Sequence, residues 1–199
     1  MAASILLVRH ATHPLVGKVL CGRAPGVSLG AAGRDQAARL GAALAGRHPA
    51  AICTSPVERA RDTADAIAAA CRVPASLDDA LDEIDFGDWT GQSFDRLAGD
   101  PAWARWNAAR GEACPPGGES MHQAQARAVA GIQRLRTAHP DGTVVAVSHA
   151  DVIKAVLMWC LGLPLDRYHA FDIDPASVST LLLWDGGGKV VRMNEGIAA

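Results

Sequence analysis

Apolar runs and amphipathic segments alternate along this chain. Residues 4–9 and 143–148 form two short, almost wholly apolar runs, a pattern typical of strands buried on both faces. Apolar positions recur at helical spacing over residues 34–46, 120–138 and 151–162. This alternation predicts an α/β fold, a three-layer α/β/α sandwich whose central sheet is mostly parallel.

A short strand at residues 51–53 precedes a predicted helix start. Ser55 is the expected N-cap, Pro56 would take the first helical position, and Glu58 would complete a capping box with the serine. The helix is expected to continue to about Cys71.

Glycines mark the predicted end of the sheet. Residues 177–184 and 189–193 flank the run Asp185-Gly186-Gly187-Gly188 and predict a closing hairpin. The following Lys189 gives a partial likeness to a P-loop, but the Ser or Thr after the lysine and the first glycine are missing. No GxGxxG follows the first strand, and no HExxH is present. Dinucleotide binding, a P-loop and that type of zinc site are therefore not indicated.

The middle of the chain, residues 86–118, is less regular and rich in tryptophan. We expect Trp89 to wall a cleft, and Trp103 and Trp106 to pack this segment onto the sheet. No internal repeat or linker is evident. The sequence therefore predicts a single domain over residues 1–199, with residues 86–118 as an irregular insertion near the active site.

Composition narrows the choice of partners. Apolar residues make up 49% of the chain, charged residues 20%, and the net charge is −2, as in ordinary globular proteins. No cluster of Lys or Arg indicates nucleic-acid binding, and no apolar stretch approaches the roughly 18 residues of a membrane span. The five cysteines are scattered without CxxC spacing, which favours reduced thiols in a cytoplasmic protein and no metal site.

Two of the apolar runs stop at a histidine. His10 follows the first strand and His149 follows the strand at 143–148, and ligands bind at such strand ends in open α/β sheets. Arg9 precedes His10, and Arg59 lies one turn into the helix after another strand. Two guanidiniums would keep His10 neutral and nucleophilic and supply forked donors for phosphate oxygens.

These residues belong to a wider resemblance. Leu7-Val8-Arg9-His10-Ala11 resembles the Arg-His-Gly signature of the histidine phosphatase superfamily, in its phosphoglycerate mutase-like branch. Further segments agree in order and spacing: Gly22–Ala37, Thr54–Ala64, Leu81–Gly91, Pro116–Ser120 and Val147–Ala150. The resemblance covers nearly the whole chain.

The resemblance implies a role for each matching residue. His10 would be the nucleophile that forms a phosphohistidine, with Arg9, Arg59 and His149 around the phosphate. Glu83 would be the general acid and base, with Asp85 as the reserve candidate. No metal or other cofactor is implied.

Further substrate contacts are expected around this core. Arg23 and Ala150 are expected to bind substrate, and His13 and His122 are additional candidates. The chain departs from the family pattern at Ala11, where glycine is usual, at Thr12-His13-Pro14, and at Val16, where asparagine is frequent. Because alanine disfavours a positive φ, the first departure bears on the loop after the histidine. The others bear on substrate identity.

The expected function is a metal-independent phosphatase that hydrolyses a small phosphorylated metabolite. The nearest alternative is a phosphoglycerate mutase that uses the same phosphohistidine, although such mutases are usually longer. A module that binds phosphorylated ligands without turnover should show a broken catalytic set. A phosphoprotein phosphatase should show a shallow, open cleft. The oligomeric state, monomer or homodimer, stays open.

Overall fold

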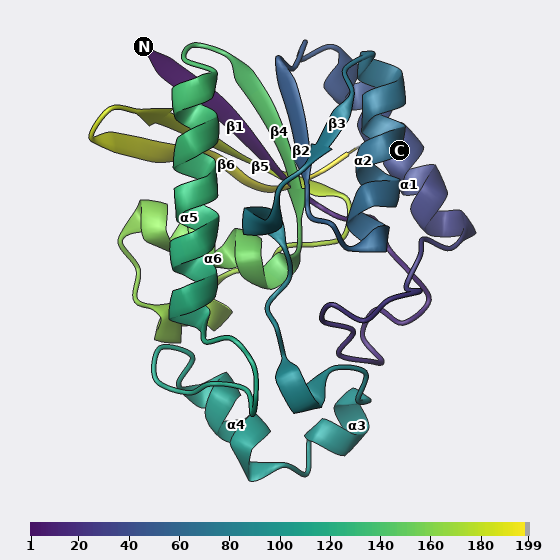
Figure 1. Cartoon of the computed structure of the whole chain (residues 1–199), viewed down its shortest axis with the longest axis vertical. Helices are drawn as coiled ribbons and strands as arrows, with labels where there is room; N and C mark the ends of the chain where they lie inside the picture. Colours follow the sequence, from purple (N-terminus) through teal and green to yellow (C-terminus); the bar gives the residue numbers. More distant parts are fainter. Residues whose placement is uncertain (198–199) are drawn as a thin grey trace.

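A computed structural model describes residues 1–197. Its centre is a six-stranded sheet (Figure 1). In order across the sheet, the strands are β3 (Ala75–Leu77), β2 (Ala51–Thr54), β4 (Thr143–Ser148), β1 (Ala2–Arg9), β5 (Ser177–Trp184) and β6 (Gly187–Gly196). The first four pair in parallel, and β5 and β6 add antiparallel strands at one edge. The predicted mostly parallel sheet and the closing hairpin are confirmed.

Helices cover both faces of the sheet. The pair α1 (Ala31–Ala45) and α2 (Glu58–Cys71) lies on one face, and α5 (Met121–Ala138) and α6 (Ala150–Leu161) lie on the other (Figure 1). Short 3-10 helices occur at Asp79–Leu81, Gly87–Trp89 and Leu165–Ala170. The three-layer arrangement agrees with the sequence prediction. Within the described residues, no helix is both long and apolar enough to span a membrane.

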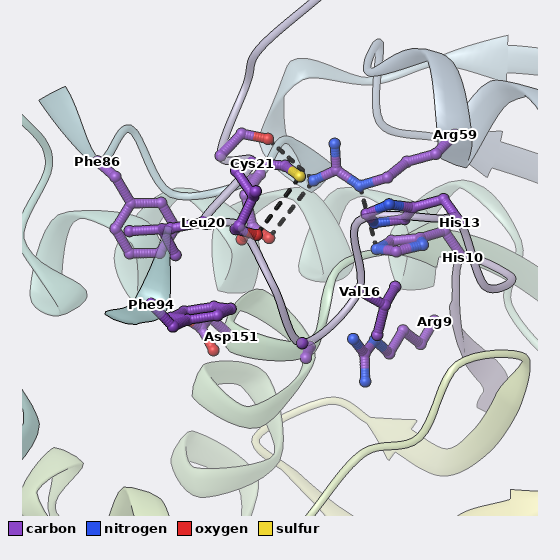
Figure 2. A pocket seen from close by; sticks show the side chains of 15 residues that line it. Arg9, His10, His13, Val16, Leu20, Cys21, Arg59, Phe86, Phe94 and Asp151 are labelled. Carbon is purple, nitrogen blue, oxygen red and sulfur yellow. Dashed lines mark hydrogen bonds and ion pairs between the residues drawn. The ribbon is translucent and has the colours of Figure 1, made fainter. Parts of the chain in front are cut away.

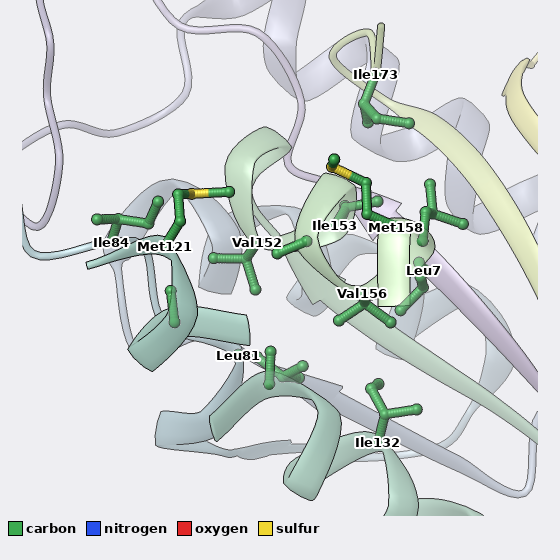
Figure 3. Close-up of a cluster of buried hydrophobic side chains, with 14 of the residues drawn as sticks. Leu7, Leu81, Ile84, Met121, Ile132, Val152, Ile153, Val156, Met158 and Ile173 are labelled. Carbon is green, nitrogen blue, oxygen red and sulfur yellow. The ribbon is translucent and has the colours of Figure 1, made fainter. Parts of the chain in front are cut away.

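Alternation along β1 explains why the sheet is buried on both sides. Leu6 and Val8 belong to the core under α1 and α2, whereas Ile5 and Leu7 belong to the core under α5 and α6. Figure 3 shows Leu7 among side chains of α5 and α6 in this second core. A continuous apolar run at this position is what a strand covered on both faces requires.

The predicted start of α2 is wrong. The helix begins at Glu58, its N-cap is Val57, and no side chain caps it. Ser55 and Pro56 remain in the turn before the helix, where Ser55 Oγ accepts a hydrogen bond from the Val57 amide at 3.2 Å. Because Ser55 does not cap the helix, its hydroxyl can face the carboxyl ends of the parallel strands. The short strand β3 was not predicted, because three residues carry too little pattern.

The insertion contains two short helices, α3 (Phe94–Leu97) and α4 (Pro101–Ala108), beyond the carboxyl ends of the parallel strands (Figure 1). Trp89 is 2% exposed and packs against Trp103 and Trp106, with ring centroids 5.3 and 6.3 Å away. Its Nε1–H donates to Asp100. The prediction that Trp89 walls the cleft is wrong, because the indole is held inside the insertion. Trp106 belongs to the core on the α5–α6 face, as expected.

Candidate active site

The carboxyl ends of two neighbouring strands, β1 and β4, bring the two histidines together. Arg9, the last residue of β1, pairs with Ser148 of β4, and the His10 amide donates to the Ser148 carbonyl at 2.9 Å. The rings of His10 and His149 are consequently 5.2 Å apart, centroid to centroid. This parallel register produces the convergence that the sequence predicted.

The hydrogen bonds of His10 identify which nitrogen carries a proton. Its Nδ1 lies 2.8 Å from the Ala11 carbonyl oxygen, which can only accept, so Nδ1–H is the donor. Nε2 then holds the lone pair and accepts a hydrogen bond from Arg59 Nε at 3.2 Å. The nitrogen that faces the arginine is therefore the nucleophilic one.

The surroundings of His10 keep its ring neutral. The side chain is 3% exposed, and burial lowers the pKa of His10 well below its usual value. The positive charges of Arg59 and Arg9 lower this pKa further. An unprotonated imidazole at pH 7 is the form that can attack phosphorus.

His149 is the centre of a hydrogen-bonded chain behind Arg59. Arg59 Nη2 donates to Nδ1 of His149 at 3.0 Å, so the ring proton is on Nε2, 2.9 Å from the Ser55 hydroxyl. Ser55 Oγ in turn donates to Asp82 Oδ1 at 3.2 Å. His149 is fully buried and does not line the cavity. Burial, and then the Arg59 charge, lower the pKa of His149 well below its usual value.

Glu83 lies beside the same guanidinium. Its Oε2 is 3.8 Å from Arg59 Nη2 and 3.6 Å from His149 Nδ1. Its backbone is held because Arg23 Nε and Arg127 Nη2 both donate to the Glu83 carbonyl, at 2.7 and 3.0 Å. Burial and the nearby negative charge of Asp151 raise the pKa of Glu83 to about 7, against the opposing effect of Arg59. The carboxyl group can therefore hold a proton near neutral pH.

Asp151, in the first turn of α6, also lines the cavity and was missed by the sequence analysis. The Tyr168 hydroxyl donates to Asp151 Oδ1, and Arg110 Nη1 donates to Oδ2 at 3.3 Å. Arg110 is itself stacked 3.9 Å from the Tyr168 ring. These contacts fix a carboxylate near Glu83. An acidic residue in a first helical turn is common, so the sequence pattern alone carried no signal.

A cavity of about 140 Å³ is lined by Arg9, His10, Arg59, Glu83 and Asp151, among other residues. Figure 2 shows Arg9, His10, His13 and Arg59 on one side of it and aromatic side chains on the other. Among residues 1–197, two buried guanidinium nitrogens on the cationic side, Arg9 Nε and Arg59 Nη1, have no hydrogen-bond partner. Unused buried donors beside a neutral imidazole are suited to an anionic ligand.

Comparison with known proteins agrees with this geometry. The sequence matches the model of the histidine phosphatase superfamily, branch 1, over residues 5–196. The chain belongs to this superfamily. The solved structure of Bacillus stearothermophilus YhfR superposes with a TM-score of 0.91 at 29% identity, covering 99% of this chain and 98% of that one.

Curated relatives are similar over different shares of their length. Phosphoserine phosphatase 1 of Hydrogenobacter thermophilus is 29% identical over 198 residues, covering 96% of this chain and 91% of the relative. A bifunctional protein of Mycobacterium tuberculosis is 34% identical over 145 residues, 72% of this chain. This match spans 40% of the length of that larger protein.

The loop after His10 in this member of the histidine phosphatase superfamily is held by α1. The Thr12 amide donates to Gln36 Oε1 at 2.9 Å, and a Cβ at Gly33 would lie 1.9 Å from the Thr12 carbonyl oxygen. Glycine is therefore required at Gly33 for this close approach. Ala11 does not adopt a positive φ and its amide donates to Thr63 Oγ1 at 3.0 Å. The alanine therefore fits this loop without strain.

Other residues predicted around the site lie at different distances from the cavity. His13, Val16 and Ala150 line it. Arg23 does not, because its guanidinium is bound by Asp82 Oδ2 at 3.2 Å and Glu119 Oε2 at 3.1 Å, beside Glu83. The predicted contact of Arg23 with substrate stays a prediction, and in this structure Arg23 holds the Glu83 carbonyl instead.

Two remaining candidates also lie away from the cavity lining. Asp85 is turned toward the Gly87 amide, which donates to its Oδ1 at 2.9 Å. His122 is exposed at the start of α5. Of the two predicted carboxylates, the structure thus brings Glu83, and not the reserve candidate Asp85, to the histidines.

Proposed function

We propose that this protein is a phosphatase that hydrolyses a small phosphomonoester through a phosphohistidine on His10 Nε2. One observation carries the proposal: a single cavity is lined by His10, whose Nε2 atom accepts a hydrogen bond from Arg59, and by the buried carboxyl of Glu83. With a pKa of about 7, Glu83 can supply a proton near neutral pH while His10 supplies a lone pair, as the first chemical step requires.

In the first step, the His10 Nε2 lone pair forms the N–P bond while the ester P–O bond breaks. The Glu83 carboxyl gives its proton to the departing oxygen, so the product leaves as a neutral alcohol. The unpartnered N–H groups of Arg59 and Arg9 stabilise the phosphoryl oxygens. His149 acts as a positioning residue, because it holds Arg59 Nη2 from behind.

In the second step, the Glu83 carboxylate takes a proton from water as the water oxygen attacks phosphorus. The P–N bond breaks, its electron pair returns to Nε2, and inorganic phosphate is released. The enzyme is restored, with the proton back on Glu83. Splitting the transfer into two displacements avoids direct attack of water on the ester.

The test compares wild type, His10→Ala and the control His122→Ala, which alters an exposed histidine outside the cavity. After rapid mixing with 32P-labelled phosphoester, wild type and His122→Ala should carry an acid-labile, base-stable label. His10→Ala should carry none and lose turnover, with an unchanged circular dichroism spectrum. Near-normal turnover of His10→Ala would overturn the proposal.

The same labelled enzyme separates hydrolysis from the mutase alternative. The label should pass to water, giving inorganic phosphate, even when excess 3-phosphoglycerate is present. Transfer to the hydroxyl of 3-phosphoglycerate would assign a mutase instead. The similarity to a phosphoserine phosphatase does not identify the alcohol part of this protein's substrate. The evidence for that part comes from the residues that line the cavity.

A further inference from the structure

The cavity has two chemically different sides. Arg9, His10, His13 and Arg59 form the side that would hold the phosphoryl group. The opposite side is an apolar wall, formed by Val19, Leu20, Phe86 and Phe94. Figure 2 shows Leu20, Phe86 and Phe94 gathered away from Arg9 and His10. The alcohol part of a bound ester would face this apolar wall.

The ionisable side chains near the apolar wall are acidic. Glu83 and Asp151 line the cavity together with Phe94. Within residues 1–197, the only Lys or Arg side chains in the lining are Arg9 and Arg59. A second anionic group on the substrate would therefore meet two acidic side chains and no free cation, in a partly desolvated space.

Two cations from neighbouring segments are not part of the lining. Lys18 is exposed to solvent between two lining residues, Gly17 and Val19. The guanidinium of Arg23 is bound by Asp82 and Glu119. A carboxylate in the cavity would therefore have to displace the ion pairs of Arg23, or draw Lys18 in from solvent.

Backbone hydrogen bonds fix the apolar wall before any ligand binds. The Phe94 amide donates to the Lys18 carbonyl at 3.0 Å, and the Leu20 amide donates to the Gln92 carbonyl at 2.9 Å. The Gly91 amide completes this short ladder by donating to Leu20 at 2.8 Å. The loop after β1 and the start of the insertion are thereby joined into one surface.

Aromatic contacts hold the side chains of the wall as well. The Phe94 ring lies 6.1 Å from that of Trp103, and the Phe86 ring lies edge-on to Trp106 at 6.4 Å. Side chains held in this way lose little freedom when a ligand arrives, which favours recognition of an apolar group by shape.

We infer that the alcohol part of the substrate is uncharged and apolar, of the size of a phenyl or branched alkyl group. The inference rests on the proposed function and specifies its substrate class. It separates this protein's preferred esters from those whose alcohol part carries a carboxylate.

The direct test uses two esters of unactivated primary alcohols, so that both place a similar demand on the general acid. We expect kcat/KM for 2-phenylethyl phosphate to exceed that for 3-phosphoglycerate by at least about tenfold. Equal values or the reverse order would overturn the inference while leaving the phosphatase proposal intact.

Variants of Phe94 test whether the wall causes the preference. Phe94→Leu should keep most of the preference, and Phe94→Ala should reduce the ratio of the two kcat/KM values about tenfold. Phe94→Lys should raise turnover of 3-phosphoglycerate. The control Ala98→Lys adds the same charge at an exposed position outside the lining and should leave the ratio unchanged. A ratio that is unaltered in all Phe94 variants would contradict the assignment.

Binding of phosphonates makes the test independent of turnover. By calorimetry with wild-type protein, 2-phenylethylphosphonate should bind at least about tenfold more tightly than 3-phosphonopropionate, with inorganic phosphate as the baseline. Tighter binding of the carboxylate-bearing compound would overturn the inference. If binding follows the expected order but no ester is hydrolysed, the proposed function fails and the ligand preference stands.

Discussion

The guanidinium of Arg59 points its Nε–H at Nε2 of His10, 3.2 Å away. The Nε2 lone pair is therefore engaged by a group whose positive charge adds to the effect of burial in keeping the ring unprotonated. Arg59 in addition donates to the Gly22 carbonyl at 2.9 Å and to His149, so its plane is fixed from three directions. Arg59 thus contributes to the neutral state of the His10 ring, after burial, and to the orientation of the ring, together with the Ala11 carbonyl.

This arrangement predicts that charge alone cannot replace Arg59. Arg59→Lys keeps a cation but loses the planar fork that reaches His10, Gly22 and His149 together. We expect kcat for p-nitrophenyl phosphate to fall about 10²- to 10³-fold. Arg61→Lys, at an exposed position on the same helix, should have wild-type kinetics. Activity of Arg59→Lys within a few-fold of wild type would show that the fork is not needed.

Glu83 as a general acid predicts a dependence on the leaving group. In Glu83→Gln, kcat/KM for 2-phenylethyl phosphate should fall about 10²- to 10⁴-fold, because its alkoxide needs a proton. The loss for p-nitrophenyl phosphate should be much smaller, since nitrophenolate is a stable anion. Exposed Glu112→Gln is the control. Equal losses for the two esters would assign Glu83 a role other than proton transfer.

The pH dependence of kcat/KM should report the ionisation of Glu83. Because Glu83 must be protonated and its pKa is about 7, kcat/KM for 2-phenylethyl phosphate should decline as pH rises through 7. Removing the negative charge in Asp151→Asn should lower the pKa of Glu83 and move this decline to lower pH. Exposed Asp95→Asn should not move it. A decline at the same pH in Asp151→Asn would refute the coupling.

The pKa of Glu83 also makes a prediction about stability. Its folded value of about 7 exceeds the usual 4.5, so folding binds an extra proton between these values. The associated stability is complete below about pH 4.5 and is lost as pH rises through 7. From pH 5 to pH 9, urea unfolding should show Glu83→Gln gaining roughly 2–3 kcal/mol relative to wild type. A constant difference would argue against a buried, destabilised carboxylate.

The Ser55 hydroxyl links His149 to Asp82, which predicts an effect without contact to substrate. Ser55→Ala leaves the Nε2–H of buried His149 without its partner. We expect a loss of about 1–3 kcal/mol in unfolding free energy and roughly tenfold lower kcat. Ser28→Ala, at an exposed position outside the cavity lining, should change neither by a comparable amount. Wild-type kinetics in Ser55→Ala would show that His149 needs no such support.

The site residues that lie at the ends of strands could be predicted from the sequence. Arg9, His10 and His149 end apolar runs, and the parallel register of β1 and β4 places them together. Periodicity and run length capture such features because they repeat along the chain. Glu83 was placed only through the family resemblance, since its segment has no regular pattern.

Contacts that depend on tertiary packing were not predicted. Ser55 satisfied the sequence rule for a capping box, but its hydroxyl is used by His149 and Asp82 instead. Phe94 and Asp151 become neighbours of the site only through the path of the insertion and the packing against Tyr168. Local sequence carries no information on such long-range choices between alternative partners.

The hydrogen-bonded ladder between the loop after β1 and the insertion carries the apolar wall. The wall that would recognise the alcohol part is thus separate from the residues that would transfer the phosphoryl group. Residues that would handle phosphorus are anchored to the sheet and to α2, whereas Leu20 and Phe94 belong to loop and insertion segments joined by main-chain bonds. Because main-chain hydrogen bonds form with many different side chains, the residues of the apolar wall can be substituted one at a time. The residues that would transfer the phosphoryl group then stay unchanged. Such a protein can acquire a new substrate preference while it keeps the same reaction.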